Sequence, residues 1–224
     1  MPKIEPFEEH SSRYEDWFEE HKFVYESELQ AVRELLPETG EGFEIGVGSG
    51  RFTAPLGIHF GIEPSRKMRE IARSRGIEAV DGVAEKLPLD DTQFDFALMV
   101  TTICFLDDAR AALKEAHRVL KPQGRLIVGF IDRDSVIGKI YQKHKDENVF
   151  YRVANFFSVH EIVALLTATG FEDLAFRQTI FRPLNEISDL EPVKMGYGEG
   201  SFVVISGIKR AAQARFLSAG RRIC

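Results

Sequence analysis

The chain has 224 residues with a formal net charge of -6, and 44% of its residues are hydrophobic, which is enough for one substantial buried core. The acidic balance argues against a nucleic-acid partner, because nucleic-acid-binding proteins usually present a basic face. The two cysteines are far apart in the sequence, which predicts neither a disulfide framework nor a metal cluster. The sequence also lacks a run of about 18 apolar residues and a signal-peptide pattern. We therefore expect a cytoplasmic protein without a membrane span.

The N-terminal residues predict a helical cap. Apolar and aromatic residues recur at three- and four-residue steps from Glu8 to Leu36, as on one face of an amphipathic helix, unbroken or broken once. Pro37 and the glycines after it end the helix. The aromatic stripe, with Tyr14 and Trp17 on it, either packs on the rest of the domain or lines a binding site.

Strands and helices alternate after the cap. The expected strands are 43–47, 58–62, 77–80, 94–100 and 125–131, and the expected helices are 64–75 and 109–120. This alternation is typical of a parallel sheet covered on both faces, which binds ligands beyond the carboxyl ends of its strands. Two further strands are expected at 171–178 and 201–208.

Residues 134–157 interrupt the alternation and are rich in lysine, histidine and aromatic residues. We interpret them as an inserted lid. The predicted organisation is a helical cap at 1–42, a main domain at 43–210 that carries this lid, and a basic tail at 211–224.

The segment Glu44-Ile45-Gly46-Val47-Gly48-Ser49-Gly50 ends the first strand with three alternating glycines. Glycine lacks a Cβ, so its backbone can closely approach a nucleotide-like ligand. A dinucleotide-binding turn has a small residue at the place that Arg51 occupies here, and the Gly-Lys-Ser/Thr of a P-loop is missing. The turn therefore favours a nucleoside without phosphates.

Five motifs follow one another between residues 43 and 131. They are Glu-x-Gly-x-Gly-x-Gly, Gly-Ile-Glu-Pro-Ser, Ala-Glu-x-Leu-Pro, Phe-Asp-Phe and Leu-Lys-Pro-x-Gly. In this order and spacing the chain resembles a class I S-adenosylmethionine-dependent methyltransferase, of the small-molecule kind with a type 11 methyltransferase domain. The resemblance implies an α/β, Rossmann-like, doubly wound sheet of seven strands, mostly parallel with an antiparallel last strand, and helices on both faces. It also implies S-adenosyl-L-methionine as cofactor and S-adenosyl-L-homocysteine as product.

The resemblance also assigns roles to residues. Glu44 lies near the amino group of the cofactor, above the glycine turn that carries its methionine part. Glu63 accepts hydrogen bonds from both ribose hydroxyls, and Pro64 lies against the adenine; the alternative for Glu63 is an acid stabilised at a helix N-terminus. The expected cofactor contacts are Glu44, Gly46, Gly48, Gly50, Glu63, Pro64, Ala84, Glu85 and Thr101.

One position departs from the family pattern. Relatives often have an aspartate that accepts a hydrogen bond from the adenine amino group, and this chain has Val83 there. We expect the backbone around Ala84 or the side chain of Glu85 to take over this contact. The stretch from Gly50 to Gly61 is short, so its helix is expected to be a single turn.

Methyl transfer from a sulfonium is an in-line displacement, in which alignment and desolvation supply much of the acceleration and a catalytic base is optional. The candidates for a catalytic role are His21, Thr101 and Thr102. The candidates for contact with the methyl acceptor are Tyr14, Trp17, His21, Cys104 and Phe105. For the residues after the fourth strand, ordinary packing is the alternative.

The expected reaction is methyl transfer to an unidentified small molecule, because the lid is compact and no additional recognition domain is apparent. A tRNA or protein methyltransferase of the same fold is one alternative, supported only by the basic tail. A non-catalytic S-adenosylmethionine-binding regulator is another, and a dinucleotide oxidoreductase is the third.

Overall fold

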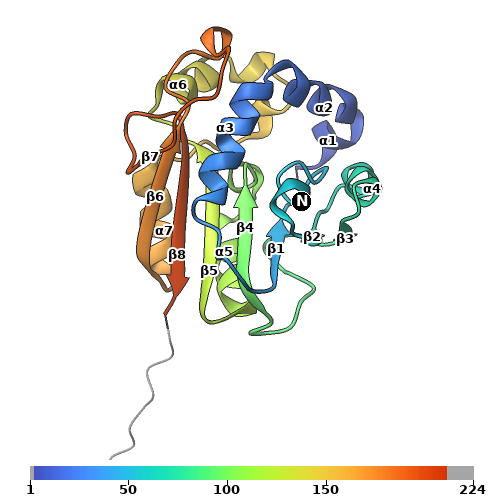
Figure 1. Cartoon of the computed structure of the whole chain (residues 1–224). Helices are drawn as coiled ribbons and strands as arrows, with labels where there is room; N and C mark the ends of the chain where they lie inside the picture. The colour runs from blue at the N-terminus through green and yellow to red at the C-terminus, as the bar shows by residue number, and fades with distance from the viewer. Residues whose placement is uncertain (1–2, 211–224) are drawn as a thin grey trace, which may run out of the picture.

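An eight-stranded sheet runs through the centre of the computed structural model, which describes residues 3–210 (Figure 1). The strand order is β3-β2-β1-β4-β5-β8-β6-β7. The strands are β1 (Gly42–Ile45), β2 (Phe60–Ile62), β3 (Glu78–Val80), β4 (Phe94–Val100), β5 (Leu120–Ile131), β6 (Phe171–Thr179), β7 (Lys194–Met195) and β8 (Phe202–Lys209). The predicted basic tail at 211–224 lies outside the described residues.

The first five strands are parallel, as predicted, and β8 is antiparallel to both of its neighbours, β5 and β6. The predicted α/β fold is therefore confirmed. The strand count was wrong by one, because β7 adds an eighth strand antiparallel to β6. This strand is only two residues long and lies in a polar loop, so it leaves no hydrophobic period in the sequence.

Helices cover both faces of the sheet. On one face, α5 (Ala109–Val119) and α7 (Val159–Ala168) pack on the strands, and on the other face α3 (Lys22–Arg33) does so. In β4, Ala97 and Met99 pack with α5 and α7, whereas Phe96 and Leu98 pack with α3. A central parallel strand is buried on both sides in this way, which explains its continuous apolar run.

Three helices, rather than one, precede the sheet. They are α1 (Glu5–Glu9), α2 (Ser11–Glu20) and α3, with breaks at His10 and His21, where the backbone leaves helical dihedral angles. In Figure 1, α1 and α2 lie beyond the carboxyl ends of the strands, and α3 returns along the sheet. The prediction of at most one break was wrong, because a straight helix could not bury apolar residues against both the strand ends and the sheet.

The segment 134–157 lies at the same end of the molecule (Figure 1). It contains α6 (Val136–Lys143) and two 3-10 turns, Lys145–Glu147 and Tyr151–Val153. The remaining helix, α4 (Arg66–Ser74), follows β2 and begins at Ser65, whose hydroxyl accepts a hydrogen bond from the Met68 amide.

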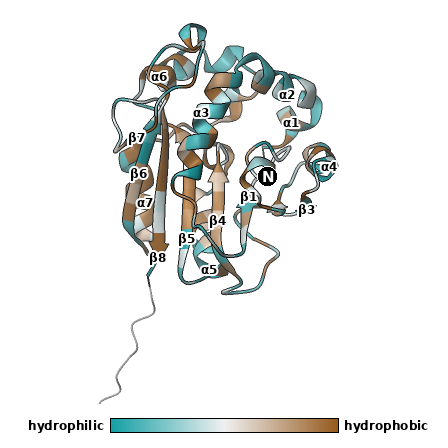
Figure 2. Cartoon of the chain, in the orientation of Figure 1, coloured by the Kyte–Doolittle hydropathy of each residue, from teal (hydrophilic) through white to brown (hydrophobic). Residues whose placement is uncertain are grey.

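Apolar residues concentrate on the strands, whereas α2 and α4 are mostly hydrophilic (Figure 2). Within residues 3–210, no helix combines the length and the apolar character needed to cross a bilayer. The helices that lie beyond the strand ends, α1 and α2, cover the end of the sheet at which the sequence predicts the ligand.

Candidate active site

The glycine turn after β1 uses its glycines for two purposes. All three have positive φ angles, at +71° for Gly46, +54° for Gly48 and +84° for Gly50, which L-residues rarely adopt. A Cβ on Gly46 would stand 2.4 Å from Thr102 Cγ2, and one on Gly50 would stand 2.2 Å from Ile77 Cδ1. A Cβ on Gly48 would meet nothing closer than 3.4 Å. Gly46 and Gly50 therefore accommodate the protein's own side chains, whereas Gly48 leaves space above it.

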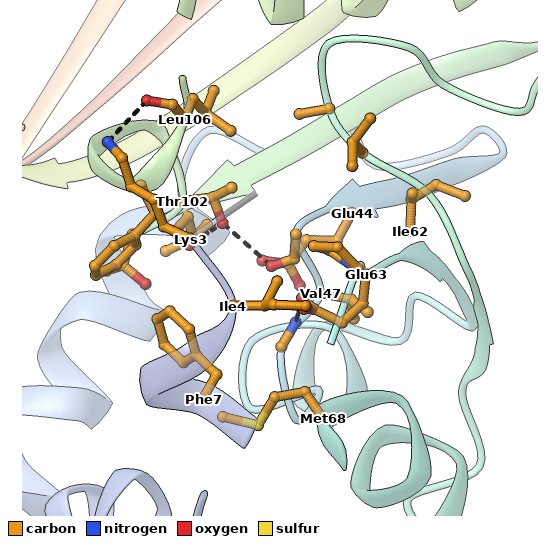
Figure 3. Close-up of a pocket in the computed structure, with 18 of the residues that line it drawn as sticks. Lys3, Ile4, Phe7, Glu44, Val47, Ile62, Glu63, Met68, Thr102 and Leu106 are labelled. Atoms are coloured by element: carbon orange, nitrogen blue, oxygen red, sulfur yellow. Dashed lines mark hydrogen bonds between the residues drawn. The ribbon is translucent and has the colours of Figure 1, made fainter. Parts of the chain in front are cut away.

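Two carboxyl groups converge beside this turn from the ends of β1 and β2 (Figure 3). Glu63 accepts hydrogen bonds from the Gly48 amide at 2.9 Å and from the Ser65 amide at 2.8 Å. The Thr53 hydroxyl donates to Glu44. Burial raises the pKa of Glu44 to about 8 and that of Glu63 to about 7, and the charge of Glu63 adds to the shift of Glu44. Buried acids with shifted pKa values that face one cleft are characteristic of functional sites.

These acids line the first of two cavities. It contains about 860 Å³ of space not filled by atoms, open solvent included. The predicted cofactor contacts that line it are Glu44, Gly46, Gly48, Glu63, Pro64, Ala84, Glu85 and Thr101. Gly50 is the one predicted contact outside its lining. The Glu85 carboxylate is already engaged, since it accepts hydrogen bonds from the Asp107 and Asp108 amides at 2.9 and 3.3 Å.

The helix α2 closes over this cavity. The Tyr14 hydroxyl is the atom 3.4 Å from the Cβ position of Gly48. Burial and the nearby charges of Glu44, Glu15 and Glu63 raise the pKa of Tyr14. The hydroxyl therefore stays protonated and can donate a hydrogen bond.

Arg51 attaches the glycine turn to α2. Its guanidinium pairs with Glu15 at 2.7 Å and with Glu19 at 2.9 Å, and it lies 5.0 Å from the centre of the Phe18 ring. Arg75 also pairs with Glu15. The sequence pattern identified Arg51 only as a residue too large for a dinucleotide-binding turn.

A second cavity adjoins the first on the side of the segment 134–157. It contains about 1260 Å³ of unfilled space, open solvent included. The two cavities share Phe7, Tyr14, Phe52, Thr101 and Phe105. Many of the other side chains that line the second cavity are aromatic residues of α2 and of the segment 134–157, with Trp17, Tyr141, Phe150, Tyr151, Phe156 and Phe157 among them.

Thr101 lies on the border between the cavities in a strained conformation. Its φ angle is +51°, which is unusual for a β-branched residue and often marks a functional site. Its amide donates to the Gly129 carbonyl at 2.8 Å, which fixes the chain as it leaves β4. No sequence signal pointed to this strain.

The structure brings together most of the predicted acceptor contacts and separates one. Tyr14, Trp17, Cys104 and Phe105 line the second cavity. His21 lies at the break between α2 and α3, where its ring packs edge-on against Trp17 at 5.0 Å, and it lines neither cavity.

The remaining candidates are engaged by the protein itself. The Thr102 hydroxyl lies 3.1 Å from the carbonyl oxygens of both Gly46 and Val100. Burial raises the pKa of the Cys104 thiol to about 12. Among residues 3–210 there is no group of three or more His, Cys, Asp or Glu that could hold a metal ion.

Sequence reasoning missed Glu28, which is only 4% exposed and lines the second cavity. The sequence feature that could have revealed it is the position of this acid on the same helix face as Leu29 and Val32, which are both buried.

Comparisons with known proteins agree with this geometry. Residues 43–128 match the family described as "Methyltransferase domain". A structure from Thermotoga maritima, described as an S-adenosylmethionine-dependent methyltransferase and possible histamine N-methyltransferase, is 57% identical with a TM-score of 0.89 and covers 91% of this chain and 98% of that chain.

Two further relatives extend the comparison. An uncharacterised protein of Methanocaldococcus jannaschii is 42% identical over 203 residues, covering 91% of this chain and 98% of its own length. The magnesium protoporphyrin IX methyltransferase of Synechocystis, solved with bound S-adenosylhomocysteine, has a TM-score of 0.67 at 13% identity, covers 92% of this chain and 97% of that chain, and shows the fold alone. The predicted family, enzyme class and cofactor are confirmed: the chain belongs to the class I S-adenosylmethionine-dependent methyltransferases.

Proposed function

We propose that the enzyme methylates a small molecule held in the second cavity, with the cofactor in the first. The observation that supports this most directly is the shared wall, since Tyr14, Thr101 and Phe105 line both spaces. A ligand in each cavity would therefore meet the other at this wall. The aromatic lining also suits a small organic molecule, because ligand sites are mostly apolar and concave.

The residues of the first cavity fit the cofactor. Glu63 uses one lone pair on each oxygen for the Gly48 and Ser65 amides, and a carboxylate has lone pairs left to accept from two ribose hydroxyls. Glu44 would face the amino group of the methionine part, whose positive charge suits a buried acid. The uncovered backbone at Gly48 would lie beneath that part.

The adenine would lie on the side of Pro64 and Ala84. Because the Glu85 carboxylate is engaged by the Asp107 and Asp108 amides, the backbone around Ala84 is the better choice for the contact that relatives make through an aspartate. Of the two alternatives for the adenine contact, the backbone around Ala84 and the side chain of Glu85, we therefore favour the backbone.

The cofactor supplies an activated methyl group on a sulfonium, whose sulfur leaves as a neutral thioether. The residues of this chain would then have to align the acceptor and exclude water. Tyr14, held over Gly48, and Thr101, fixed by Gly129, are placed to do so. None of the candidate side chains is poised as a base: the pKa of Cys104 is raised, and the Thr102 hydroxyl faces backbone carbonyl oxygens.

We also propose that residues 1–42 act as a cap and residues 134–157 as a lid over a main domain at 43–210. Both segments contribute side chains to the second cavity. Acceptor choice would then depend on these two segments, and cofactor binding on the main domain. The description of the Thermotoga maritima structure names histamine as a possible acceptor of that protein, which makes amines the first class of acceptor to test here.

The test has two parts. Glu63→Ala should severely weaken cofactor binding in calorimetry without changing the circular dichroism spectrum, whereas Glu70→Ala, at an exposed ion pair on α4, should leave it unchanged. Incubation of the wild type with isotopically labelled cofactor and a metabolite extract should yield a labelled small molecule. Cofactor binding without any labelled product would favour the regulator instead, and label found only in tRNA or protein would favour a macromolecular acceptor.

A further inference from the structure

Glu28 is a buried acid without a partner. It lies on α3 with 4% of its surface exposed and lines the second cavity. No residue among 3–210 forms a hydrogen bond or an ion pair with its carboxyl group, and burial alone raises its pKa to about 8. The other buried acids near the cofactor cavity, Glu44 and Glu63, each have hydrogen-bond donors. Among the buried acids of residues 3–210, Glu28 is therefore the one whose carboxyl group has no hydrogen-bond donor.

Several aromatic rings line the same cavity as this acid. The rings of Tyr141 and Tyr151 lie 4.3 Å apart, and Phe156 lies 5.9 Å from Tyr151. Burial raises the pKa of both tyrosines, and the charge of Glu28 adds to both shifts. Trp17 lines the same space from α2. The buried carboxyl group and several aromatic side chains thus border one cavity, and the two other charged residues that line it, Arg13 and Glu20, are exposed at its rim.

Such a lining discriminates between ligands by charge. An unpaired carboxylate in an apolar site is costly until a cation or a donor reaches it. Ring faces attract cations because their quadrupole is negative. An anionic ligand would be repelled both by the carboxylate and by the ring faces, and a neutral apolar ligand would leave the acid unpaired.

We propose that the second cavity binds a molecule carrying an ammonium group, which pairs with Glu28 among the faces of Tyr141, Tyr151 and Trp17. This inference rests on the proposed function, since it names the chemical class of the acceptor. Glu28 is then the residue that determines specificity.

The ammonium is an anchor rather than the methylated atom. A protonated nitrogen has no lone pair, so it cannot attack a methyl group while it is paired with Glu28. Glu28 lines only the second cavity, whereas Tyr14 and Thr101 line both. The acceptor therefore carries its cationic group at Glu28 and a separate nucleophilic atom at the wall that Tyr14 and Thr101 form.

The chain carries its own reporter for a binding test. Trp17 is its single tryptophan and lines the second cavity, so its fluorescence responds to ligands there. We would titrate the full-length protein, at about pH 8.5 so that the Glu28 carboxyl is largely ionised, with three probes that share one scaffold. They are 2-phenylethylammonium, 2-phenylethanol and 3-phenylpropanoate.

The wild type should bind the ammonium about tenfold more tightly than the alcohol, and the carboxylate least. Glu28→Gln should remove this preference while keeping the affinity for the alcohol and for the cofactor. Glu26→Gln, on the same helix but 38% exposed, should keep the preference. Tyr151→Leu should weaken binding of the ammonium more than that of the alcohol.

The inference is wrong if the alcohol binds the wild type as tightly as the ammonium, if no probe binds, or if Glu28→Gln keeps the preference. Transfer of labelled methyl groups to a metabolite extract is measured separately. Transfer without charge-selective binding would overturn the role of Glu28 and leave the proposed function standing. Charge-selective binding without transfer would support the role of Glu28 and overturn the proposed function.

Discussion

Arg51, at the end of the glycine turn, is held by Glu15 of α2, with 2.7 Å between Nη2 and Oε2 and 18% of each side chain exposed. Glu15 also pairs with Arg75, which in turn donates to the Ser49 carbonyl. One carboxylate thus connects α2 both to the glycine turn and to the C-terminal end of α4.

Glu15→Gln should loosen this attachment. The variant places a neutral amide against two partly buried guanidinium groups in place of the carboxylate that they share, which should lower the free energy of unfolding by about 1–3 kcal/mol. Urea denaturation measures this change, and hydrogen exchange should become faster in α1 and α2. The matched control is Glu19→Gln, because Glu19 pairs with the same arginine but is 73% exposed, and its loss should change stability by less than about 0.5 kcal/mol. Equal effects of the two variants would contradict this role for Glu15.

Cofactor affinity should depend on pH through Glu63. Burial raises the pKa of this carboxyl to about 7, so it is mainly protonated below that pH and mainly ionised above it. The ionised form has only acceptors to offer to ribose hydroxyls, so affinity should fall as the pH decreases through about 7. Calorimetry across this range measures the effect.

Glu63→Gln is the control for this titration. It should bind the cofactor more weakly at every pH and show a flatter profile, because the amide does not titrate. If the variant keeps the slope of the wild type, the dependence comes from another group, and Glu44 with its pKa of about 8 would be tested next.

Two aromatic residues of α2 should have separable roles. Trp17 lines only the second cavity, whereas Tyr14 lines both. Trp17→Ala should therefore raise the KM for the acceptor and leave cofactor affinity unchanged. Tyr14→Ala should raise the KM for the acceptor and also weaken cofactor binding, because the Tyr14 hydroxyl lies over Gly48. Steady-state kinetics with cofactor calorimetry separates the two, and a loss of cofactor affinity in Trp17→Ala would show that the cavities are not independent.

Glu28→Gln should make the protein more stable at alkaline pH. The pKa of this carboxyl rises from 4.5 to about 8 on folding, so between these values the folded state binds a proton that the unfolded state releases. Stability is full below about pH 4.5 and is lost as pH rises toward 8, at most by about 1.4 kcal/mol per pH unit.

The variant lacks this proton and should lose less stability over the range. Melting temperatures from about pH 6 to about pH 8 measure the difference between the two proteins. A parallel decline would mean that the Glu28 carboxyl is not protonated in the folded state.

The sequence was informative where local pattern and position in the fold coincide. The β4 run from Phe94 to Val100 was predicted with both ends correct, because a strand buried on both faces is apolar throughout. Most of the predicted cofactor contacts line the first cavity, because they lie at the ends of β1 and β2; that they bind the cofactor stays a prediction. The turn at Ala54–Leu56 was confirmed as a short 3-10 helix.

The second cavity was harder to anticipate because distant segments build it. Tyr151 and Glu28 are far apart in sequence and come together only after α3 turns back along the sheet. A single acid on a mostly apolar helix face looks like an imperfect amphipathic pattern until its surroundings are known. The strain at Thr101 and the double anchoring through Glu15 likewise depend on contacts between elements that no local period encodes.

Because Tyr14 forms part of the wall of both cavities, α2 is constrained in a way that the segment 134–157 is not. A substitution that reshapes the second cavity from α2 also changes what lies over Gly48, whereas no residue of 134–157 lines the first cavity. Divergence toward new acceptors within this lineage should therefore accumulate first in residues 134–157, with the aromatic face of α2 changing more slowly.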